Sequence, residues 1–121
     1  MLKLHGLERR SWLARFERDY DNLRAALQWA NESGDVAILT RLAAALGWFW
    51  ELQGRRNEAR TWLGAVLATP TNQQPLFARL RVVHMAAHVA GEEGDLERSR
   101  VLGAESLAMA EAIGDQWAIA L

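Results

Sequence analysis

The chain has 121 residues, 14 basic and 15 acidic side chains, a formal net charge of −1 and no cysteine. This length fits one domain that buries roughly two thirds of the surface its unfolded form exposes. The missing cysteines exclude disulfides, thiolate catalysis and Cys-ligated metal sites. The balanced charge gives no global case for binding nucleic acid or an anionic membrane.

The longest apolar run covers residues 42–50, far short of the roughly 20 residues needed to span a membrane. The N-terminus also lacks a secretory signal, so we expect a cytoplasmic protein.

Glycines followed by a polar residue divide the chain at regular intervals. Glycine readily ends a helix, and an aspartate after it can cap the next one. A further loop is expected over residues 70–75, which have proline at both ends. A break therefore recurs about every 20 residues, and two helices make a unit of about 40, a length typical of α-solenoid repeats. The glycine breaks are Gly34–Asp35, Gly54–Arg55, Gly94–Asp95 and Gly114–Asp115.

These breaks, with the abundance of helix-favouring alanine and leucine, predict an all-α fold of about five helices and a truncated sixth. In chain order we expect one helix over residues 8–33, either continuous or broken near residues 19–21. Four more follow over 35–53, 56–68, 76–93 and 96–113, and a sixth begins at Gln116. The single domain, residues 1–121, thus comprises an N-terminal helix or helix pair (8–33), a first clear repeat (35–69), a second repeat (76–113) and the start of a truncated one (115–121).

Apolar and small side chains follow the helical period, as stacked helices require. The predicted second helix has a broad apolar stripe, so it should be covered on more than one side. Four of the six tryptophans have core-facing spacings, and Trp48 and Trp117 do not. The core-facing tryptophans are Trp12, Trp29, Trp50 and Trp62; the small residues expected where helices cross closely are Ala43, Gly47, Ala59, Ala87 and Ser99.

Residues 41–70 resemble a tetratricopeptide repeat (TPR). The positions that match its pattern of small, aromatic and turn residues are Leu46, Gly47, Trp50, Gly54, Ala59, Leu63 and Pro70. Residues 80–113 fit the same frame more loosely through Ala87, Gly94, Asp95 and Ser99. Gly103 departs from it, since a bulky residue is expected there, and indicates either a packing defect or a close helix approach. The resemblance implies a right-handed α-solenoid of antiparallel helix pairs.

A second resemblance covers residues 12–67. It rests on WLARFERDYDNLRAALQWA at 12–30, the Gly34–Asp35 pair and RLAAALGWFWELQG at 41–54. This stretch is similar to the start of the helical sensor region of bacterial STAND-class signal-transduction ATPases, relatives of NLR receptors that include large LuxR-type regulators. The resemblance implies a sensor piece of a longer protein. The chain has no Gly-x-x-x-x-Gly-Lys-Ser/Thr motif for nucleotide phosphates.

In the TPR frame the first helix of each pair lines the concave side of the solenoid. We therefore expect a protein or peptide to bind there, with arginine and histidine holding a carboxylate and Trp48 anchoring an apolar side chain. An ordinary solvated face, a structural or oligomerising spacer and a small-molecule inducer sensor remain alternatives. The predicted concave residues are Arg41, Ala44, Trp48, Glu51 and Leu52 in the first repeat, and Arg81, His84, His88 and Glu92 in the second.

Other chemistry has little support in the sequence. No nucleophile elbow, zincin motif or dinucleotide fingerprint is present, so we expect no enzyme and no cofactor. His84 and His88 have metal-ligand spacing, with Glu92 one turn further, yet Met85 stands where a zincin has glutamate, and we expect no metal. Acidic residues interleave with the arginine pairs, which favours a solvated surface over direct nucleic-acid contact. Self-association through the C-terminal segment is a further expectation, since a solenoid end needs covering.

Overall fold

Five α-helices account for most of the computed structural model, which describes residues 6–120 except for the side chains of residues 6–10, 12, 13, 73 and 116–120. The helices are α1 (Gly6–Ser33), α2 (Val36–Leu52), α3 (Arg56–Leu67), α4 (Leu76–Glu92) and α5 (Leu96–Ala120), with a short 3-10 helix, η1 (Thr71–Gln73), before α4. No strand occurs in this part of the chain, which confirms the all-α prediction. None of its helices is both long and apolar enough to cross a membrane.

Three of the four predicted glycine breaks are present. Gly34, Gly54 and Gly94 have φ angles of 76°, 70° and 83°, the left-handed conformation that ends α1, α2 and α4. Asp35 and Asp95 then each accept a hydrogen bond of 3.1 Å from the backbone N–H three residues further on. The aspartates therefore cap α2 and α5 as the sequence predicts.

The fourth break is absent, and the prediction of a sixth helix beginning at Gln116 is wrong. Helix α5 continues through Gly114 and Asp115 to Ala120. Gly114 does not take a positive φ angle, and no atom lies within 4 Å of the place where its Cβ would be. A glycine inside a helix costs only about 1 kcal/mol relative to alanine, so without a packed neighbour to force a turn the helix continues. Helix α1 is likewise continuous across residues 19–21.

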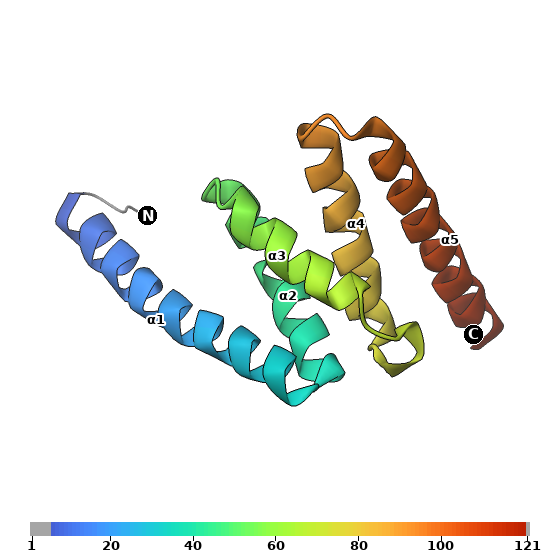
Figure 1. Ribbon diagram of the computed structural model, residues 1–121, viewed down its shortest axis with the longest axis horizontal. Coiled ribbons are helices and arrows are strands. Elements are labelled where there is room, and N and C mark those ends of the chain that lie inside the picture. The colour runs from blue at the N-terminus through green and yellow to red at the C-terminus, as the bar shows by residue number, and fades with distance from the viewer. Residues whose placement is uncertain (1–5, 121) are drawn as a thin grey trace.

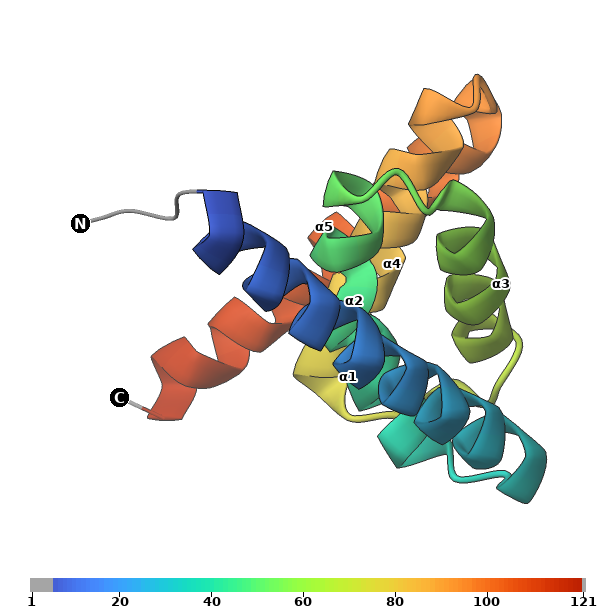
Figure 2. The ribbon, with the colours of Figure 1, turned by 90° about the vertical axis from the view of Figure 1, so that its left-hand side faces the viewer.

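Successive helices lie side by side in chain order, from α1 at one end to α5 at the other (Figure 1). Helix α2 packs against α1, α3 and α4, and α4 packs against α2, α3 and α5. In Figure 2, α1 crosses in front of α2, and α3 and the upper part of α4 lie above α1 in this view. Helices α2 and α4, the predicted first helices of the two repeats, thus contact each other directly.

Small residues let these helices approach closely. Ala43, Ala59 and Ala87 are buried, as predicted. At Gly47 an added Cβ would lie only 3.2 Å from Cγ of Met85 on α4. The glycine therefore sets the spacing between α2 and α4, because any side chain there would displace Met85.

The tryptophans divide between core and surface. Trp50 and Trp62 are buried, as predicted, at 0% and 8% exposure. Trp29 is 55% exposed, so its predicted core position is wrong: its turn of α1 leaves one side to solvent while Leu27 and Ala30 supply the buried contacts. The side chains of Trp12 and Trp117 lie outside the described residues.

A partly buried network of hydrogen bonds joins α1, α2 and α3. The indole Nε1 of Trp50 donates to the Tyr20 hydroxyl oxygen over 2.6 Å, and that hydroxyl donates to Glu58 Oε2 over 2.5 Å. Arg24 and Arg55 each hydrogen-bond Glu58 over 3.1 Å and lie against the Tyr20 ring, 4.9 and 4.8 Å from its centroid. Every polar group of Tyr20 and Trp50 is therefore satisfied within the core, as burial requires.

The same network shifts the pKa values of Tyr20 and Glu58. Burial raises the pKa of Tyr20, and the neighbouring Glu58 carboxylate adds to the effect. Burial alone would also raise the pKa of Glu58, yet hydrogen bonds from Tyr20, Arg55 and Arg24 outweigh it and lower that pKa. The ionised carboxylate of Glu58 is thus the form that the fold stabilises.

Candidate functional site

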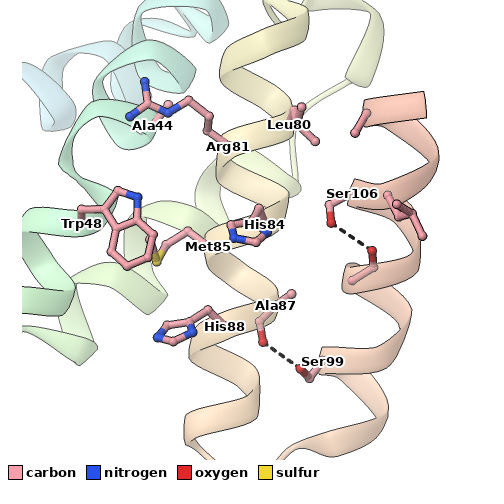
Figure 3. A pocket seen from close by; sticks show the side chains of 13 residues that line it. Ala44, Trp48, Leu80, Arg81, His84, Met85, Ala87, His88, Ser99 and Ser106 are labelled. Atoms are coloured by element: carbon pink, nitrogen blue, oxygen red, sulfur yellow. Dashed lines mark hydrogen bonds between the residues drawn. The ribbon is translucent and has the colours of Figure 1, made fainter. Parts of the chain in front are cut away.

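A hollow of about 650 Å³ opens between α2, α4 and α5 (Figure 3). Its volume falls within the range of about 300–1,000 Å³ typical of ligand pockets. Five of the nine predicted concave residues line it: Ala44, Trp48, Arg81, His84 and His88. The remaining lining residues are Leu80, Met85 and Ala87 on α4, and Ser99, Gly103, Ser106, Leu107 and Ala110 on α5.

Helix α4 supplies the polar side chains of the hollow. At about 100° per residue, Arg81, His84 and His88 share one face of the helix within a fan of about 60°. Trp48 faces them from α2, half exposed, with its ring centroid 6.1 Å from that of His88. Buried Met85 lies between them, its sulfur directed toward Trp48 (Figure 3). The sequence-predicted stripe on α4 is therefore one continuous surface that Trp48 extends.

The α5 wall of the hollow was not anticipated, because in the TPR frame the second helix of a pair lies away from the concave side. Apart from Leu107 it consists of small residues, among them Gly103, whose added Cβ would have nothing within 4 Å. Of the two interpretations of Gly103, a close helix approach is therefore wrong, since the glycine borders open space. The serine hydroxyls beside it are occupied: Ser99 donates to Ala87 O and Ser106 to Gly103 O, each over 2.9 Å.

The other predicted residues lie around the hollow. Arg41 borders an adjacent depression with Arg81, beside the half-exposed Leu76 and Phe77. Leu52 is 82% exposed near the end of α2. Glu51 and Glu92 flank His88 at the edge of the hollow.

The ionisable side chains that line the hollow are all basic. Its lining includes one arginine and two histidines and no acidic residue. Within the described part of the chain, neither Arg81 nor His84 has a hydrogen-bonded or ion-paired side-chain partner. A guanidinium without a partner beside an apolar wall can form a charge-assisted hydrogen bond with an incoming carboxylate. The hollow therefore suits a ligand that carries an acidic group next to an apolar one.

Glu51, His88 and Glu92 form a compact cluster from two helices. The Nε2 atom of His88 lies 3.3 Å from Glu51 Oε2 and 3.4 Å from Glu92 Oε2. Arg56 Nη2 lies 3.6 Å from the other oxygen of Glu92, Oε1. The pKa of Glu51 is lowered, first by a hydrogen bond with Glu92 and then by His88 and Arg56, while burial opposes the shift. His84 does not join this cluster, although it has metal-ligand spacing from His88 in the sequence.

The arginine pairs at 55–56 and 79–81 do not combine into a basic surface, and the side chains of the pair at 9–10 lie outside the described residues. Arg79 is buried, and its Nη2 lies 3.1 Å from Glu105 on α5. Arg55 is bound to Glu58, and Arg56 to Glu92. Three of the four arginines in these two pairs thus bind carboxylates. Arg81 is the one of the four that has no such partner among the described residues.

No protein-family model matches the chain, and no solved structure matches it either. A stretch of 55 residues is 34% identical to three mycobacterial proteins whose names describe them as HTH-type transcriptional regulators: Mb0914c of Mycobacterium bovis, and MT0914 and Rv0890c of Mycobacterium tuberculosis. The chain is similar to a small part of much longer proteins. The matched stretch is 46% of this chain and 6% of each regulator.

Proposed function

We propose that this chain is a peptide-recognition sensor module of a larger bacterial regulator of the STAND or LuxR type. Its helix pairs would form a right-handed TPR-like α-solenoid, with α2 and α4 lining the concave face. Three features support this proposal: left-handed glycines at 34, 54 and 94, direct packing of α2 on α4, and the similarity of part of the chain to long transcriptional regulators. The module would act by binding, without making or breaking covalent bonds.

The chemistry of the hollow limits the kind of peptide it would take. Arg81 and His84, which have no side-chain partners among the described residues, face a largely apolar hollow opposite Trp48. This single observation carries the proposal. A segment with an acidic side chain, or a terminal carboxylate, next to a large apolar side chain would pair its charge with Arg81 and place the apolar group against Trp48.

Two substitutions test the proposal by different routes. Short synthetic peptides with Glu next to Leu or Phe serve as probes, and the same peptides with Gln replace the charge. We expect Arg81→Ala to weaken Glu-peptide binding at least tenfold in isothermal titration calorimetry, since a charge-assisted bond contributes about 1.5–3 kcal/mol. Because Arg81 is exposed, its loss should leave the unfolding midpoint nearly unchanged.

Gly103→Leu should block the same peptides by filling the hollow from α5, where nothing opposes a new side chain. Gly64→Leu is the matched control, because Gly64 is also helical with nothing within 4 Å and borders a separate depression on the opposite face of α4. Binding by the Gln peptides equal to that of the Glu peptides would contradict the role of Arg81. Equal losses in both glycine variants would argue against the hollow as the binding place.

A small-molecule sensor is the second candidate, favoured by the volume of the hollow. A thermal-shift screen with small carboxylates separates the two: protection by these compounds and not by peptides would support the inducer sensor. Protection by neither would support a structural or oligomerising spacer, and a light-scattering dilution series would then show whether the chain self-associates.

A further inference from the structure

A metal-binding geometry lies beside the hollow. Three side chains, Glu51 from α2 and His88 and Glu92 from α4, each offer one ligand atom, and these atoms all lie within 4.8 Å of one another. We propose that Glu51, His88 and Glu92 bind a Zn²⁺ ion that bridges α2 and α4. This proposal concerns a different ligand from the peptide and does not depend on the proposed function.

The distances from His88 to the two carboxylates fit tetrahedral zinc. Zinc binds histidine nitrogen and carboxylate oxygen at about 2.0–2.1 Å, which places neighbouring ligand atoms of a tetrahedron about 3.3 Å apart. His88 Nε2 is already 3.3 and 3.4 Å from the two carboxylate oxygens. His88 Nε2 is therefore placed to share one ion with either carboxylate. One nitrogen and two oxygens are also ligands that zinc accepts, whereas Mg²⁺ and Ca²⁺ favour sites made of oxygen alone.

The charges of the cluster also favour a bound cation. Two carboxylates as close as those of Glu51 and Glu92 repel each other when both are ionised, unless a proton or a cation lies between them. A zinc ion held by both carboxylates would offset this repulsion. Arg56 contacts Oε1 of Glu92 and leaves Oε2, the oxygen nearest His88, available to the ion. Contacts of this kind orient metal-binding carboxylates in many sites.

The sequence pointed to two of the three ligands, His88 and Glu92, and could not reveal Glu51. His84, His88 and Glu92 are at helical spacing along one chain segment, whereas Glu51 lies 37 residues before His88 and reaches it only because α2 packs on α4. His84 supplies the natural control. It lies one turn from His88 on the same face of α4, has similar exposure, and does not belong to the cluster.

Isothermal titration calorimetry with ZnCl₂ tests the proposal on the whole chain. We expect one zinc ion per chain to bind the wild type, and His88→Ala to weaken binding more than about 100-fold, because even the residues that only support metal ligands contribute 10- to 100-fold. His84→Ala should bind zinc as the wild type does. His88 is partly exposed, so circular dichroism should show an unchanged helix content in both variants.

Further variants test whether His88 and Glu51 are the zinc ligands. The chain has three histidines, and a His5→Ala/His84→Ala variant that retains only His88 should still bind zinc with unchanged affinity. Glu51→Gln should weaken zinc binding at least tenfold, and MgCl₂ should produce no comparable binding in any variant. No saturable zinc binding by the wild type, or zinc binding that survives His88→Ala, would overturn the proposal. So would loss of binding in the variant that keeps only His88.

Discussion

Tyr20 shows how one side chain can hold three helices together. Its hydroxyl accepts from Trp50 on α2 and donates to Glu58 on α3, while its own backbone belongs to α1. The cost of burying these polar groups is offset only when each of them is bonded, since an unsatisfied buried group costs about 1–3 kcal/mol. Glu58 therefore contributes to the attachment of α1 through its bonds to Tyr20 and Arg24.

We expect the stability supplied by Glu58 to depend on pH in a defined direction. Its folded pKa is lowered from an ordinary value of 4.5, so its contribution is complete above about pH 4.5 and is lost as the pH falls through the lower folded pKa. At neutral pH, Glu58→Gln should lower the free energy of unfolding by about 1–2 kcal/mol. Urea denaturation of both proteins between pH 7 and pH 3 should show this difference shrinking in acid.

Glu97→Gln is the matched control for this experiment. Glu97 lies 2.6 Å from Arg100 on the surface of α5, with a highly exposed side chain, and exposed pairs of this kind contribute about 0–1 kcal/mol. Its replacement should change stability little at any pH. A Glu58→Gln difference that stayed constant down to pH 3 would mean that the ionised carboxylate is not the stabilising form.

At the scale of the helix, the glycines have two different roles that sequence alone does not separate. Gly34, Gly54 and Gly94 end helices through positive φ angles. Gly47, Gly64, Gly103 and Gly114 lie inside helices, and their neighbours decide what each does. Gly47 meets Met85 across the α2–α4 contact, whereas the other three border open space.

This difference predicts opposite effects for two helix glycines. Gly47→Leu should lower the free energy of unfolding by about 1–3 kcal/mol, because an added side chain would overpack the contact with Met85. Gly64→Ala should raise it by about 0.5–1 kcal/mol, because alanine favours the helix and nothing obstructs its Cβ. Chemical denaturation of the two variants measures both. A stabilising Gly47→Leu would show that α2 and α4 are not held at this spacing.

At the scale of the molecule, α4 connects the two halves of the chain. It packs against α2 and α3 on one side and α5 on the other, and Val82 and Val83 within it are fully buried. In a stack of helices each unit is stabilised mainly by its neighbours. A short stack with one shared helix should therefore unfold as a single unit.

We expect Val83→Ala to reveal this coupling. Val83 is fully buried in α4, and the substitution should cost about 1–3 kcal/mol through lost contacts and a residual cavity. The denaturation midpoint should fall equally by circular dichroism, which reports helix content, and by the fluorescence of the six tryptophans, which include buried Trp50 and Trp62. Transitions that separate by the two probes would show that the helices do not unfold as a single unit.

Local signals in the sequence were sufficient for the helices and insufficient for one boundary. The left-handed glycines and capping aspartates at 34–35 and 94–95 were predictable, because turn and cap preferences depend on neighbouring residues alone. The same Gly-Asp dipeptide occurs at residues 114–115, yet α5 continues through it. Trp29 similarly matches a core spacing and is exposed. Both errors have the same cause. Whether a helix ends at a glycine, and whether a tryptophan is buried, depends on packing partners that the local sequence pattern does not contain.

The sequence by itself determined an all-helical chain, most helix ends and the shared face of Arg81, His84 and His88, since each follows from backbone preferences and the helical period. Tertiary structure decided which surfaces meet. Only the packing of α2 on α4 brings Glu51 to His88, and only the placement of α5 turns Gly103 into one wall of a hollow. Contacts between residues far apart in the chain depend on how whole helices fit together, which no local pattern records.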